Sequence, residues 1–408
     1  MSEKAWIEVP ANEEPGTPEL SLVVPAMNEE VTVGEFVDWC LEGIKRSGVR
    51  GEVIIVDSSQ DRTPQIALQH GARVLHASKR GLGRAYIDAI PFVRGQYVVM
   101  GDADLTYEFR ELKQFVAAFH DGAEFIMGSR FKGGIEPGAM PALHRYFGTP
   151  VTTWMLNVIY GTRFEDIHCG MRGVTLDGFK RMRLKSQSWQ YASEMIIKAV
   201  HLRLRVAEVP VHFFKDREGR ESHLKRIGWT APWVAGWLTL KALFTHGADF
   251  FLVMPGLVMT AFGGAGLLML GGGPLLVLGV GFSMHWMLLF LVSFLCGLNF
   301  SLTGVLAKII YDEEGARSQR WKRLFSLDRV LPTAGVLLVI GGLLTLPLLQ
   351  VYVHDNYRLP AELGVPTYQA ILGLALGLGA FSLFTTSLVI NAALSGQSPA
   401  VPEQAHGA

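Results

Sequence analysis

The hydrophobic pattern of the chain changes near residue 250. Four apolar stretches follow that point, at 250–272, 284–308, 330–352 and 367–392. Each has more than about 20 residues, enough at about 1.5 Å per residue to cross a hydrocarbon layer of about 30 Å. Their interiors hold almost no formal charge and show no polar face at helical spacing. The pattern therefore predicts a transmembrane domain of four helices over 249–393.

Before residue 222 the pattern is different, because short apolar runs alternate with amphipathic stretches. The expected strands are 20–25, 52–57, 72–76, 96–101 and 124–128, and the expected helices are 30–47, 63–70, 82–93 and 109–120. Continuous apolar strands separated by helices are typical of a mainly parallel, doubly wound sheet covered on both faces. We therefore expect an α/β domain over 20–221 that binds its ligands at the carboxyl ends of the strands.

The remaining segments connect or flank these domains. Over 222–248 a tryptophan recurs every fourth residue, at Trp229, Trp233 and Trp237, with basic residues nearby. This pattern favours amphipathic juxtamembrane helices at the membrane surface, although a helix packed on the soluble domain would also place tryptophans in this way. Residues 1–19 are expected to be extended or disordered, and 394–408 are expected to be a disordered tail.

The distribution of charge predicts an orientation. Basic residues gather in the link between the second and third apolar stretches, at Lys308, Arg317, Arg320, Lys322, Arg323 and Arg329, whereas 271–283 has no charge. Positively charged loops stay on the cytoplasmic side, so the link, both termini and the α/β domain are expected there. The chain is thus interpreted as an integral protein of a bacterial inner membrane or an archaeal plasma membrane.

Composition excludes several classes of protein. The chain has 37 basic and 37 acidic residues, so it lacks the positive excess typical of a protein that binds nucleic acid. Its 3 cysteines are far apart, which excludes a disulfide framework and a cysteine-based zinc site. Gly81 and Gly83 open a helix but lack the third glycine of a dinucleotide-binding loop, which makes a hydride-transfer enzyme a poor interpretation.

Polar residues follow three of the predicted strands. The first strand runs into VVPAMNEE, in which Asn28 could be a helix cap, and the second ends at Asp57. The fourth ends in GDAD, and its carboxylates Asp102 and Asp104 would repel each other without a cation. Hard oxygen ligands suit Mg2+ or Mn2+, which usually bridges to substrate phosphates. Lys79 would flank a sugar-nucleotide pocket or belong to a solvated face.

These motifs together resemble the family 2 glycosyltransferases, which have the nucleotide-diphospho-sugar (GT-A) fold. The whole series adds GSRF (128–131), the segment 144–173 and KDREGRESHLK (215–225). In that order it resembles the polyprenyl-phosphate glycosyltransferases, which include the dolichyl-phosphate mannose and glucose synthases. The resemblance implies transfer of one sugar from a UDP-glucose or GDP-mannose type of donor to undecaprenyl or dolichyl phosphate.

The resemblance also implies roles for individual residues. The implied donor-binding set is Pro25, Ala26, Asn28, Glu29, Asp57, Asp102, Ala103, Asp104 and Arg217, with Lys79 and Lys225 as additional cations. The implied metal ligands are Asp102 and Asp104, and the implied catalytic residues are Asp104, Arg130 and Arg217. The implied contacts of the acceptor phosphate are Arg130, Arg145, Thr149 and Ser222.

This chain departs from the family pattern at several positions. Thr149 replaces the more usual serine, while Arg220 and His223 replace a glycine and a lysine, so Lys225 is expected to supply the missing charge. Thr106 stands where the mannose synthases have a glutamine that helps to bind the metal. The identity of the sugar and of a further metal ligand therefore stays open.

The segment 144–173 has two interpretations from its residues alone. An apolar helix beside arginines would lie against the bilayer and present cations to a lipid phosphate, or it would be an ordinary core helix. Asp166 and Arg172 could form a structural ion pair, and Cys169 is read as packing. A phosphate acceptor is already an anion at neutral pH, so the expected reaction is a direct displacement with inversion that needs no general base.

Two other functions fit parts of the sequence. A processive polysaccharide synthase joins the same fold to membrane helices, but its QxxRW signature is matched here only by Ser318-Gln319-Arg320-Trp321, at the wrong spacing. A lipid flippase or transporter would need ionisable residues inside the membrane, and the stretches offer little beyond His285. Glycine-rich faces around Gly263 and Gly266 would allow close helix contacts, including contacts in a homo-oligomer.

Overall fold

The computed structural model divides the chain into two compact units, Met1–Thr245 and His246–Ala408. The residues it describes are 5–11, 16–78, 81–217, 237, 240–241, 244, 247–311, 318–358 and 364–395. The predicted juxtamembrane helices therefore lie almost entirely outside the described residues, and so do Lys79, Ser222 and Lys225.

The first unit is built on an eight-stranded sheet in the order β1-β4-β3-β2-β5-β7-β6-β8. Its strands are β1 (Trp6–Glu8), β2 (Leu20–Ala26), β3 (Gly51–Asp57), β4 (Arg73–His76), β5 (Tyr97–Met100), β6 (Phe125–Ser129), β7 (Arg172–Thr175) and β8 (Val206–Pro210). The four strands from β4 to β5 are mutually parallel, and β7 is antiparallel to both of its neighbours. The expected α/β fold of the GT-A type is confirmed.

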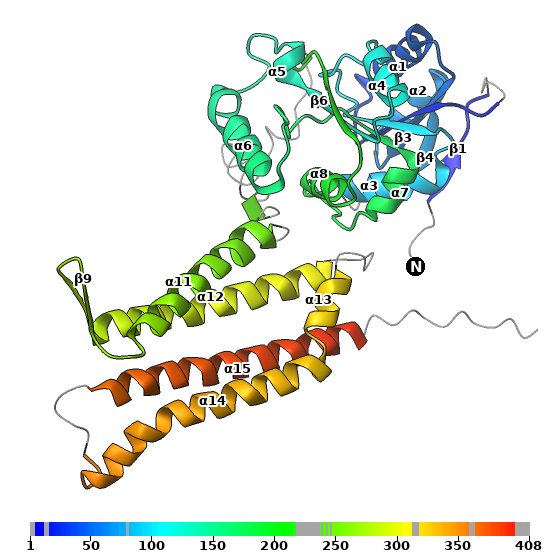
Figure 1. Ribbon diagram of the computed structural model, residues 1–408. Coiled ribbons are helices and arrows are strands. Elements are labelled where there is room, and N and C mark those ends of the chain that lie inside the picture. The colour runs from blue at the N-terminus through cyan, green and yellow to red at the C-terminus, as the bar shows by residue number, and fades with distance from the viewer. Residues whose placement is uncertain are drawn as a thin grey trace, which may run out of the picture. The chain divides into compact units, whose positions relative to one another are not determined.

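Helices cover both faces of this sheet, with α1, α2 and α4 on one face and α3, α7 and α8 on the other (Figure 1). Their bounds are α1 (Val33–Ser47), α2 (Thr63–Gln69), α3 (Leu82–Ala89), α4 (Lys113–His120), α7 (Leu176–Met182) and α8 (Tyr191–His201). Helix α1 buries Val33, Phe36, Val37, Cys40 and Ile44, which recur at helical spacing. Beyond β6 lie the short helix α5 (Arg130–Gly133), the π-helical turn His144–Gly148 and helix α6 (Thr149–Tyr160).

The predicted strands and helices of this unit agree with the structure apart from their ends. The largest differences are at the start of α4, which begins at Lys113 instead of near residue 109, and at the end of α3, which stops at Ala89 instead of near residue 93. Strands β1, β7 and β8 were not predicted, since each has only three to five residues and none is a continuous apolar run. Part of the first 19 residues thus joins the sheet, because β1 pairs with the edge of β4.

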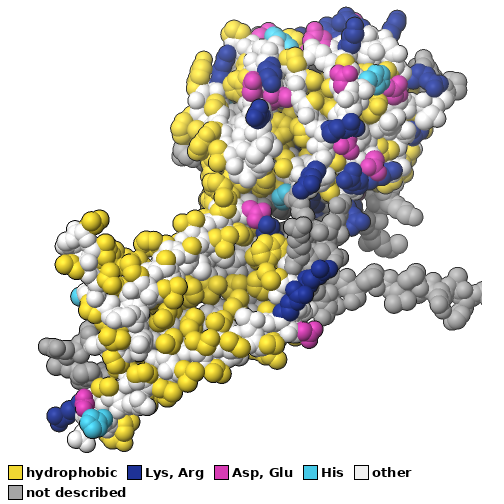
Figure 2. Space-filling view, in the orientation of Figure 1, with side chains coloured by type: hydrophobic (Ala, Val, Ile, Leu, Met, Phe, Trp, Pro, Cys, Tyr) yellow, Lys and Arg dark blue, Asp and Glu magenta, His cyan; other side chains and the backbone are white. Residues whose placement is uncertain are grey.

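The second unit contains four helices that are long and apolar enough to cross a membrane. These spans are Asp249–Leu270, Met284–Ile309, Leu327–His354 and Val365–Ala392. The first is formed by the π-helical turn η4 (Asp249–Val253) and helix α11 (Met254–Leu270). The other three lie, in order, within α12 (Met284–Tyr311), α14 (Leu327–His354) and α15 (Val365–Ser395). Figure 2 shows hydrophobic side chains along the visible face of these helices and charged side chains near their ends. The uncharged link expected at 271–283 forms a hairpin of β9 (Leu275–Val277) and β10 (Val280–Phe282).

Glycines set the close approach of α11 and α12. A methyl group added to Gly263 would lie 2.3 Å from the backbone nitrogen of Phe294, and one added to Gly266 would lie 2.2 Å from the ring of Phe290. The glycine face expected to allow helix contacts is therefore used within the chain, and a homo-oligomer stays a prediction. Pro347 lies inside α14, whereas Pro255 stands in the first turn of α11, where a proline costs no hydrogen bond.

A buried carboxylate ties together the amino ends of β2, β3 and β4. Glu52 is 5% exposed and accepts hydrogen bonds from Ser21 Oγ (2.6 Å), Arg73 Nη1 (2.7 Å) and Arg94 Nε (2.7 Å). Burial alone would raise the pKa of Glu52, but these hydrogen bonds and charges lower it below its ordinary value. The carboxylate therefore stabilises the folded sheet only in its ionised form.

Replacing this carboxylate should destabilise the first unit. We expect Glu52→Ala to cost about 3 kcal/mol, which corresponds to about 6–12 °C in the apparent Tm, because it removes the carboxylate that pairs with the buried Arg73 and with the more exposed Arg94. The contribution of Glu52 is present above the ordinary glutamate pKa of about 4.3 and is lost as the pH falls through its lower folded-state pKa. Thermal unfolding followed by circular dichroism between pH 7 and pH 3 measures both effects. The exposed Glu111→Ala is the control, and an equal Tm for the two variants would contradict this role.

Candidate active site

The polar turns expected at the carboxyl ends of the strands meet at one edge of the sheet. Strand β2 lies between β3 and β5, so the turn after Ala26 is flanked by Asp57 on one side and by the Gly101–Asp104 segment on the other. The hydroxyl of Thr32, just before α1, lies 3.1 Å from the carbonyl oxygen of Ala103. The three predicted donor-binding segments are therefore neighbours in space.

Asn28 holds the first two of these segments together. Its backbone has a φ of 58°, in the left-handed region that asparagine tolerates better than most residues. Its backbone N–H donates to Ser59 Oγ (2.8 Å), and its side-chain oxygen accepts from the N–H of Gln60 (3.0 Å). The alternative that Asn28 caps helix α1 is wrong, because the residue before that helix is Thr32.

Asp57 and Glu29 are both buried beside these turns. Asp57 is 4% exposed, burial raises the pKa of its carboxyl, and the N–H of Ser59 lies 3.3 Å from its Oδ1. Glu29 is 7% exposed, and its backbone N–H donates to Thr63 Oγ1 (2.9 Å). Asp57 thus places a carboxylate that accepts few hydrogen bonds from the protein at the carboxyl end of β3.

The acidic pair after β5 is half-buried and held from several sides. Oδ1 of Asp104 accepts from Thr106 Oγ1 (2.5 Å) and from the N–H of Thr106 (3.1 Å). The carbonyl of Thr106 accepts in turn from the N–H of Phe214 (2.8 Å), which anchors this loop to the segment after β8. Two carboxylates two residues apart, both partly open to solvent, form an oxygen donor set that fits Mg2+ or Mn2+.

Asp102 lies among buried tyrosines. Burial raises the pKa of Tyr86, Tyr107 and Tyr191, and the negative charge of Asp102 adds to each shift. Tyr86 donates to the carbonyl of Gly101 (3.0 Å), and Tyr107 accepts from the N–H of Gly170 (2.8 Å). These tyrosines stay protonated, so they hold the acidic segment without adding charge.

The described residues hold no cluster of three or more histidine, cysteine or carboxylate side chains placed to bind a metal. An ion held by Asp102 and Asp104 would take its remaining ligands from water and substrate oxygens.

Arg130, predicted to contact the acceptor phosphate, is paired with a buried carboxylate. Its Nε lies 2.6 Å from Asp166 Oδ2 and its Nη2 lies 2.9 Å from Oδ1, while Arg130 is 8% and Asp166 0% exposed. Burial alone would raise the pKa of Asp166, but the Arg130 guanidinium lowers it below its ordinary value. The ion pair considered between Asp166 and Arg172 is therefore wrong.

Arg172 instead makes backbone contacts. It is 1% exposed and donates to the carbonyls of Cys169 (2.9 Å), Ala192 (2.5 Å) and Ile167 (3.1 Å). These three bonds fix the turn Ile167–Gly170 against the start of α8. Cys169 is fully buried, and burial raises the pKa of its thiol to about 12, in agreement with a packing role.

A buried histidine joins the same turn to α6. His168 Nε2 lies 2.8 Å from Thr152 Oγ1, whose hydroxyl donates to the carbonyl of Gly148 (2.7 Å). Burial and the nearby charge of Arg130 lower the pKa of His168 to about 4, so it is neutral at physiological pH. Nothing in the sequence singles out His168, because a lone histidine in a loop is not distinctive.

The other predicted residues lie in different surroundings. Thr149 is 2% exposed at the start of α6, and Arg145 lies over the ring of Tyr146 at 5.6 Å. Arg217 pairs with Glu35 (2.5 Å) on the first turn of α1, next to the donor-binding turns. Pro25 and Ala26 end β2 as expected. The roles assigned to these residues stay predictions.

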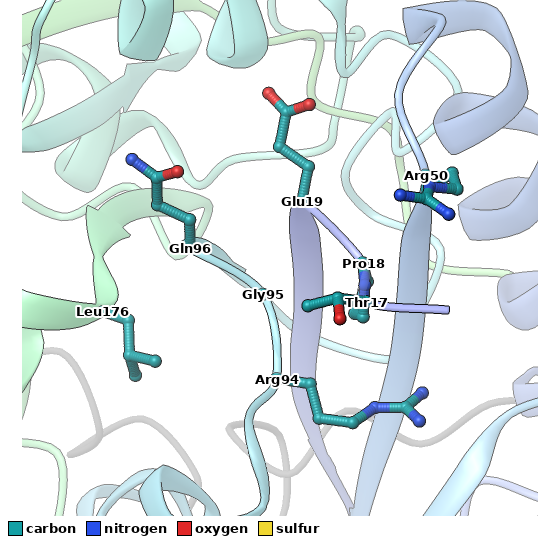
Figure 3. Close-up of a pocket in the computed structure, with 8 residues that line it drawn as sticks. All are labelled: Thr17, Pro18, Glu19, Arg50, Arg94, Gly95, Gln96 and Leu176. Atoms are coloured by element: carbon teal, nitrogen blue, oxygen red, sulfur yellow. The ribbon is translucent and has the colours of Figure 1, made fainter. Parts of the chain in front are cut away.

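One surface hollow of the first unit lies away from the predicted site residues. It has a volume of about 390 Å³ and is lined by Thr17, Pro18, Glu19, Arg50, Arg94, Gly95, Gln96 and Leu176 (Figure 3). These residues precede β2, β3 and β5 or follow β7, so the hollow lies at the amino ends of the parallel strands. It contains none of the predicted site residues, and doubly wound sheets bind their ligands at the opposite edge.

A doubly wound sheet with paired carboxylates and polar turns at its carboxyl edge defines a GT-A nucleotide-sugar enzyme. Residues 21–186 match the model of the family described as glycosyl transferase family 2. The low-salt glycan biosynthesis hexosyltransferase Agl6 of Haloferax volcanii is 33% identical over 378 residues, which are 90% of this chain and 88% of that protein. The chain belongs to glycosyltransferase family 2 and is an enzyme of that family.

The chain is also similar to another relative and to a solved structure. A dolichyl-phosphate hexose transferase of Haloferax volcanii is 30% identical over 208 residues, which are 49% of this chain and 85% of that protein. The expected resemblance to polyprenyl-phosphate glycosyltransferases is thereby confirmed. Among solved structures, glucosyl-3-phosphoglycerate synthase of Mycobacterium tuberculosis with Mn2+, UDP and glucosyl-3-phosphoglycerate is similar at a TM-score of 0.43 and 19% identity, covering 56% of this chain and 80% of that one.

The packing of Gly170 against Asp102 gives a direct test of the acidic pair. A methyl group at residue 170 would lie 2.7 Å from Asp102 Oδ2 and 3.0 Å from Tyr107 Oη, so Gly170→Ala should displace the carboxylate. We expect about a tenfold loss of Mn2+ affinity in the presence of UDP, measured by electron paramagnetic resonance. Gly148→Ala is the control, because its methyl group would meet only one atom, at 3.6 Å. Wild-type Mn2+ affinity in Gly170→Ala would contradict the assignment.

Proposed function

We propose that this enzyme transfers one hexose from a nucleoside diphosphate sugar to a polyprenyl phosphate at the cytoplasmic face of a membrane. The observation that carries the proposal is an exposed apolar face, formed by the π-helical turn and α6, that begins beside Arg145 and backs onto the buried pair of Arg130 and Asp166. Such a face suits a lipid, and the arginines suit its phosphate.

The apolar face is formed by large side chains that are exposed in the described part of the first unit. Its members recur at helical spacing and are Leu143 (52% exposed), Tyr146 (74%), Phe147 (63%), Val151 (36%), Trp154 (64%) and Val158 (47%). Exposed apolar surface of this kind marks sites that contact membranes, lipids or proteins. The opposite face of α6 packs inward through Thr152, Thr153 and Leu156, so an ordinary core helix does not explain the pattern.

Cationic and neutral groups gather where a phosphate would enter. Arg145 is next to Tyr146 at one end of the apolar face. Burial and the charge of Arg130 lower the pKa of His144, which leaves that imidazole neutral at physiological pH. In the described part of the chain, Arg130 Nη1 forms no hydrogen bond, whereas Nε and Nη2 are held by Asp166. Arg130 can therefore offer one edge of its guanidinium to an anion while the other edge stays fixed.

The donor would occupy the carboxyl edge of the sheet. Asp57 and the turn at Pro25 and Ala26 would hold the nucleoside, while the acidic segment after β5 would face the diphosphate. Asp102 and Asp104 would hold Mg2+ or Mn2+, which when bound neutralises charge on the departing nucleoside diphosphate. Arg217, which pairs with Glu35 on the first turn of α1, would add positive charge there. The family resemblance implies the same role for Lys225, which lies outside the described residues.

The transfer reaction then requires little beyond the alignment of the two substrates. An oxygen of the lipid phosphate attacks the anomeric carbon and forms a new C–O bond as the bond from that carbon to the diphosphate oxygen breaks. The electron pair leaves with the nucleoside diphosphate, and the configuration of the anomeric carbon inverts. The attacking oxygen is already an anion near neutral pH, so no proton has to move and no general base is required. Arg130 and Arg145 would orient the acceptor, which supplies the entropic part of the rate enhancement.

The second unit supports a membrane location for this reaction. Its four apolar helices have the length and composition of membrane spans, and the chain shares most of its length with a hexosyltransferase. A relative named a dolichyl-phosphate hexose transferase supports a polyprenyl phosphate as the acceptor. The basic link between the second and third spans supports a cytoplasmic location for the first unit.

Removal of Asp104 tests the donor site. We expect Asp104→Ala to lower the rate of transfer by about 100-fold or more, because the charge that builds on the leaving group loses its main stabilising partner. The measurement is release of nucleoside diphosphate by purified protein with Mg2+ and a polyprenyl phosphate. Asp121→Ala, at an exposed aspartate just after α4, is the control for folding and expression. Full activity in Asp104→Ala would remove the metal assignment.

Changes on the apolar face test the acceptor site. We expect the double variant Phe147→Ser, Trp154→Ser to raise the KM for polyprenyl phosphate by about 100-fold or more, since each aromatic side chain buried against the lipid would contribute about 1.5–3 kcal/mol and each 1.4 kcal/mol is about tenfold. The KM for the sugar nucleotide should stay the same, because Phe147 and Trp154 are on the exposed side of this segment and not on the side that packs into the unit. Leu41→Ser, at an exposed leucine of α1, is the control. An unchanged acceptor KM would refute contact between this face and the lipid.

A further inference from the structure

We propose that Trp6 and His76 form the outer wall of the subsite for the nucleobase of the donor, and that this wall contributes to base selection. The inference rests on the proposed function, because it extends the donor site beyond Asp57. Neither residue belongs to the motifs on which the family resemblance depends, and Trp6 lies in the segment before the predicted α/β domain.

The pairing of the strands places these side chains in one row. Ala26 of β2 is opposite Asp57 of β3, Asp57 is opposite His76 of β4, and His76 is opposite Trp6 of β1. Side chains that are lateral neighbours in a sheet point to the same face. The row therefore runs across four adjacent strands at the carboxyl ends of β2, β3 and β4, and it starts at the predicted nucleoside contacts.

The outer two members of the row form an aromatic stack. The rings of Trp6 and His76 are 4.1 Å apart with 22° between their planes, and His76 Nε2 lies 3.1 Å from Glu8 Oε2. Glu8 thus fixes the orientation of the imidazole. Trp6 remains 54% exposed although it is a large apolar side chain, so its stack with His76 leaves much of the indole open.

The row has the chemistry that a nucleobase requires. A base presents a polar edge with ring N–H donors and two flat faces, and it is bound by acceptors on the edge and aromatic groups on the faces. Asp57 supplies a buried acceptor that the protein contacts through Ser59, whose N–H lies 3.3 Å from Asp57 Oδ1. The Trp6–His76 stack supplies flat apolar surface next to it. The distance from Asp57 out to this wall would limit the size of the base that fits.

The stack also fastens β1 to the sheet, so the test must separate binding of a base from stability. The matched control is His120, another histidine of the first unit that contacts a carboxylate, with His120 Nε2 2.6 Å from Glu19 Oε1. Glu19 immediately precedes β2, so this pair lies at the amino ends of the strands, away from the predicted donor site.

The experiment is calorimetric titration of the full-length, detergent-solubilised protein in Mg2+ with UDP, with GDP and with inorganic pyrophosphate. For whichever nucleotide the wild type binds, we expect Trp6→Ala and His76→Ala to weaken binding by about tenfold, as expected for the loss of one base–aromatic stack. Trp6→Phe should restore binding to within about twofold. Pyrophosphate affinity should stay unchanged in all variants, and His120→Ala should bind all three probes as the wild type does.

Several results would overturn the inference. Wild-type nucleotide affinity in Trp6→Ala would refute the wall while leaving the proposed function intact if sugar transfer persists. An equal loss of nucleotide and pyrophosphate binding would show that Trp6 acts only through the fold of the site. Failure of the wild type to bind either nucleotide would contradict the proposed function as well.

Discussion

The buried ion pair between Arg130 and Asp166 is the interaction on which the geometry of the site depends. A carboxylate with no exposed surface is stable only if its charge is matched, and here the match comes from one guanidinium and from the N–H groups of Arg130 and His168, each at 3.2 Å. The pair joins the end of β6 to the loop before β7. Breaking either side would leave an uncompensated buried charge, so this loop is fixed relative to the sheet.

From this pair the constraint extends to the face that we assign to the lipid. His168 contacts Thr152, and the N–H of Ile167 lies 3.4 Å from Thr153 Oγ1, so the inner side of α6 is fixed to the same loop. Arg172 and Tyr107 connect that loop to α8 and, through Gly170, to the surroundings of Asp102. The apolar side of α6 and the acidic pair after β5 are therefore held within one packed network, as transfer between two bound substrates requires.

Much of this arrangement could be predicted from the sequence, because buried parallel strands appear as continuous apolar runs. The carboxyl ends of these strands lie at one edge of the sheet, which places Asp57, Asp102 and Asp104 there. The partner of Asp166 could not be predicted. Arg172 and Arg130 both belong to motifs near Asp166, and only the packing of the loop determines which of them pairs with it. Strand β1 has three residues and no periodicity, so neither its pairing with β4 nor the stack of Trp6 on His76 was visible. The roles of residues that the structure does not describe, among them Lys225, remain predictions.

The central claim is that the acceptor is a lipid monophosphate that receives a single sugar. The most direct measurement is incubation of the purified protein, Mg2+ and undecaprenyl or dolichyl phosphate with a panel of labelled sugar nucleotides, followed by extraction into organic solvent and mass spectrometry. The account predicts one organic-soluble product with one hexose per lipid phosphate and inverted anomeric configuration. A product that lengthens with time, or label that never enters the organic phase with any donor, would contradict it.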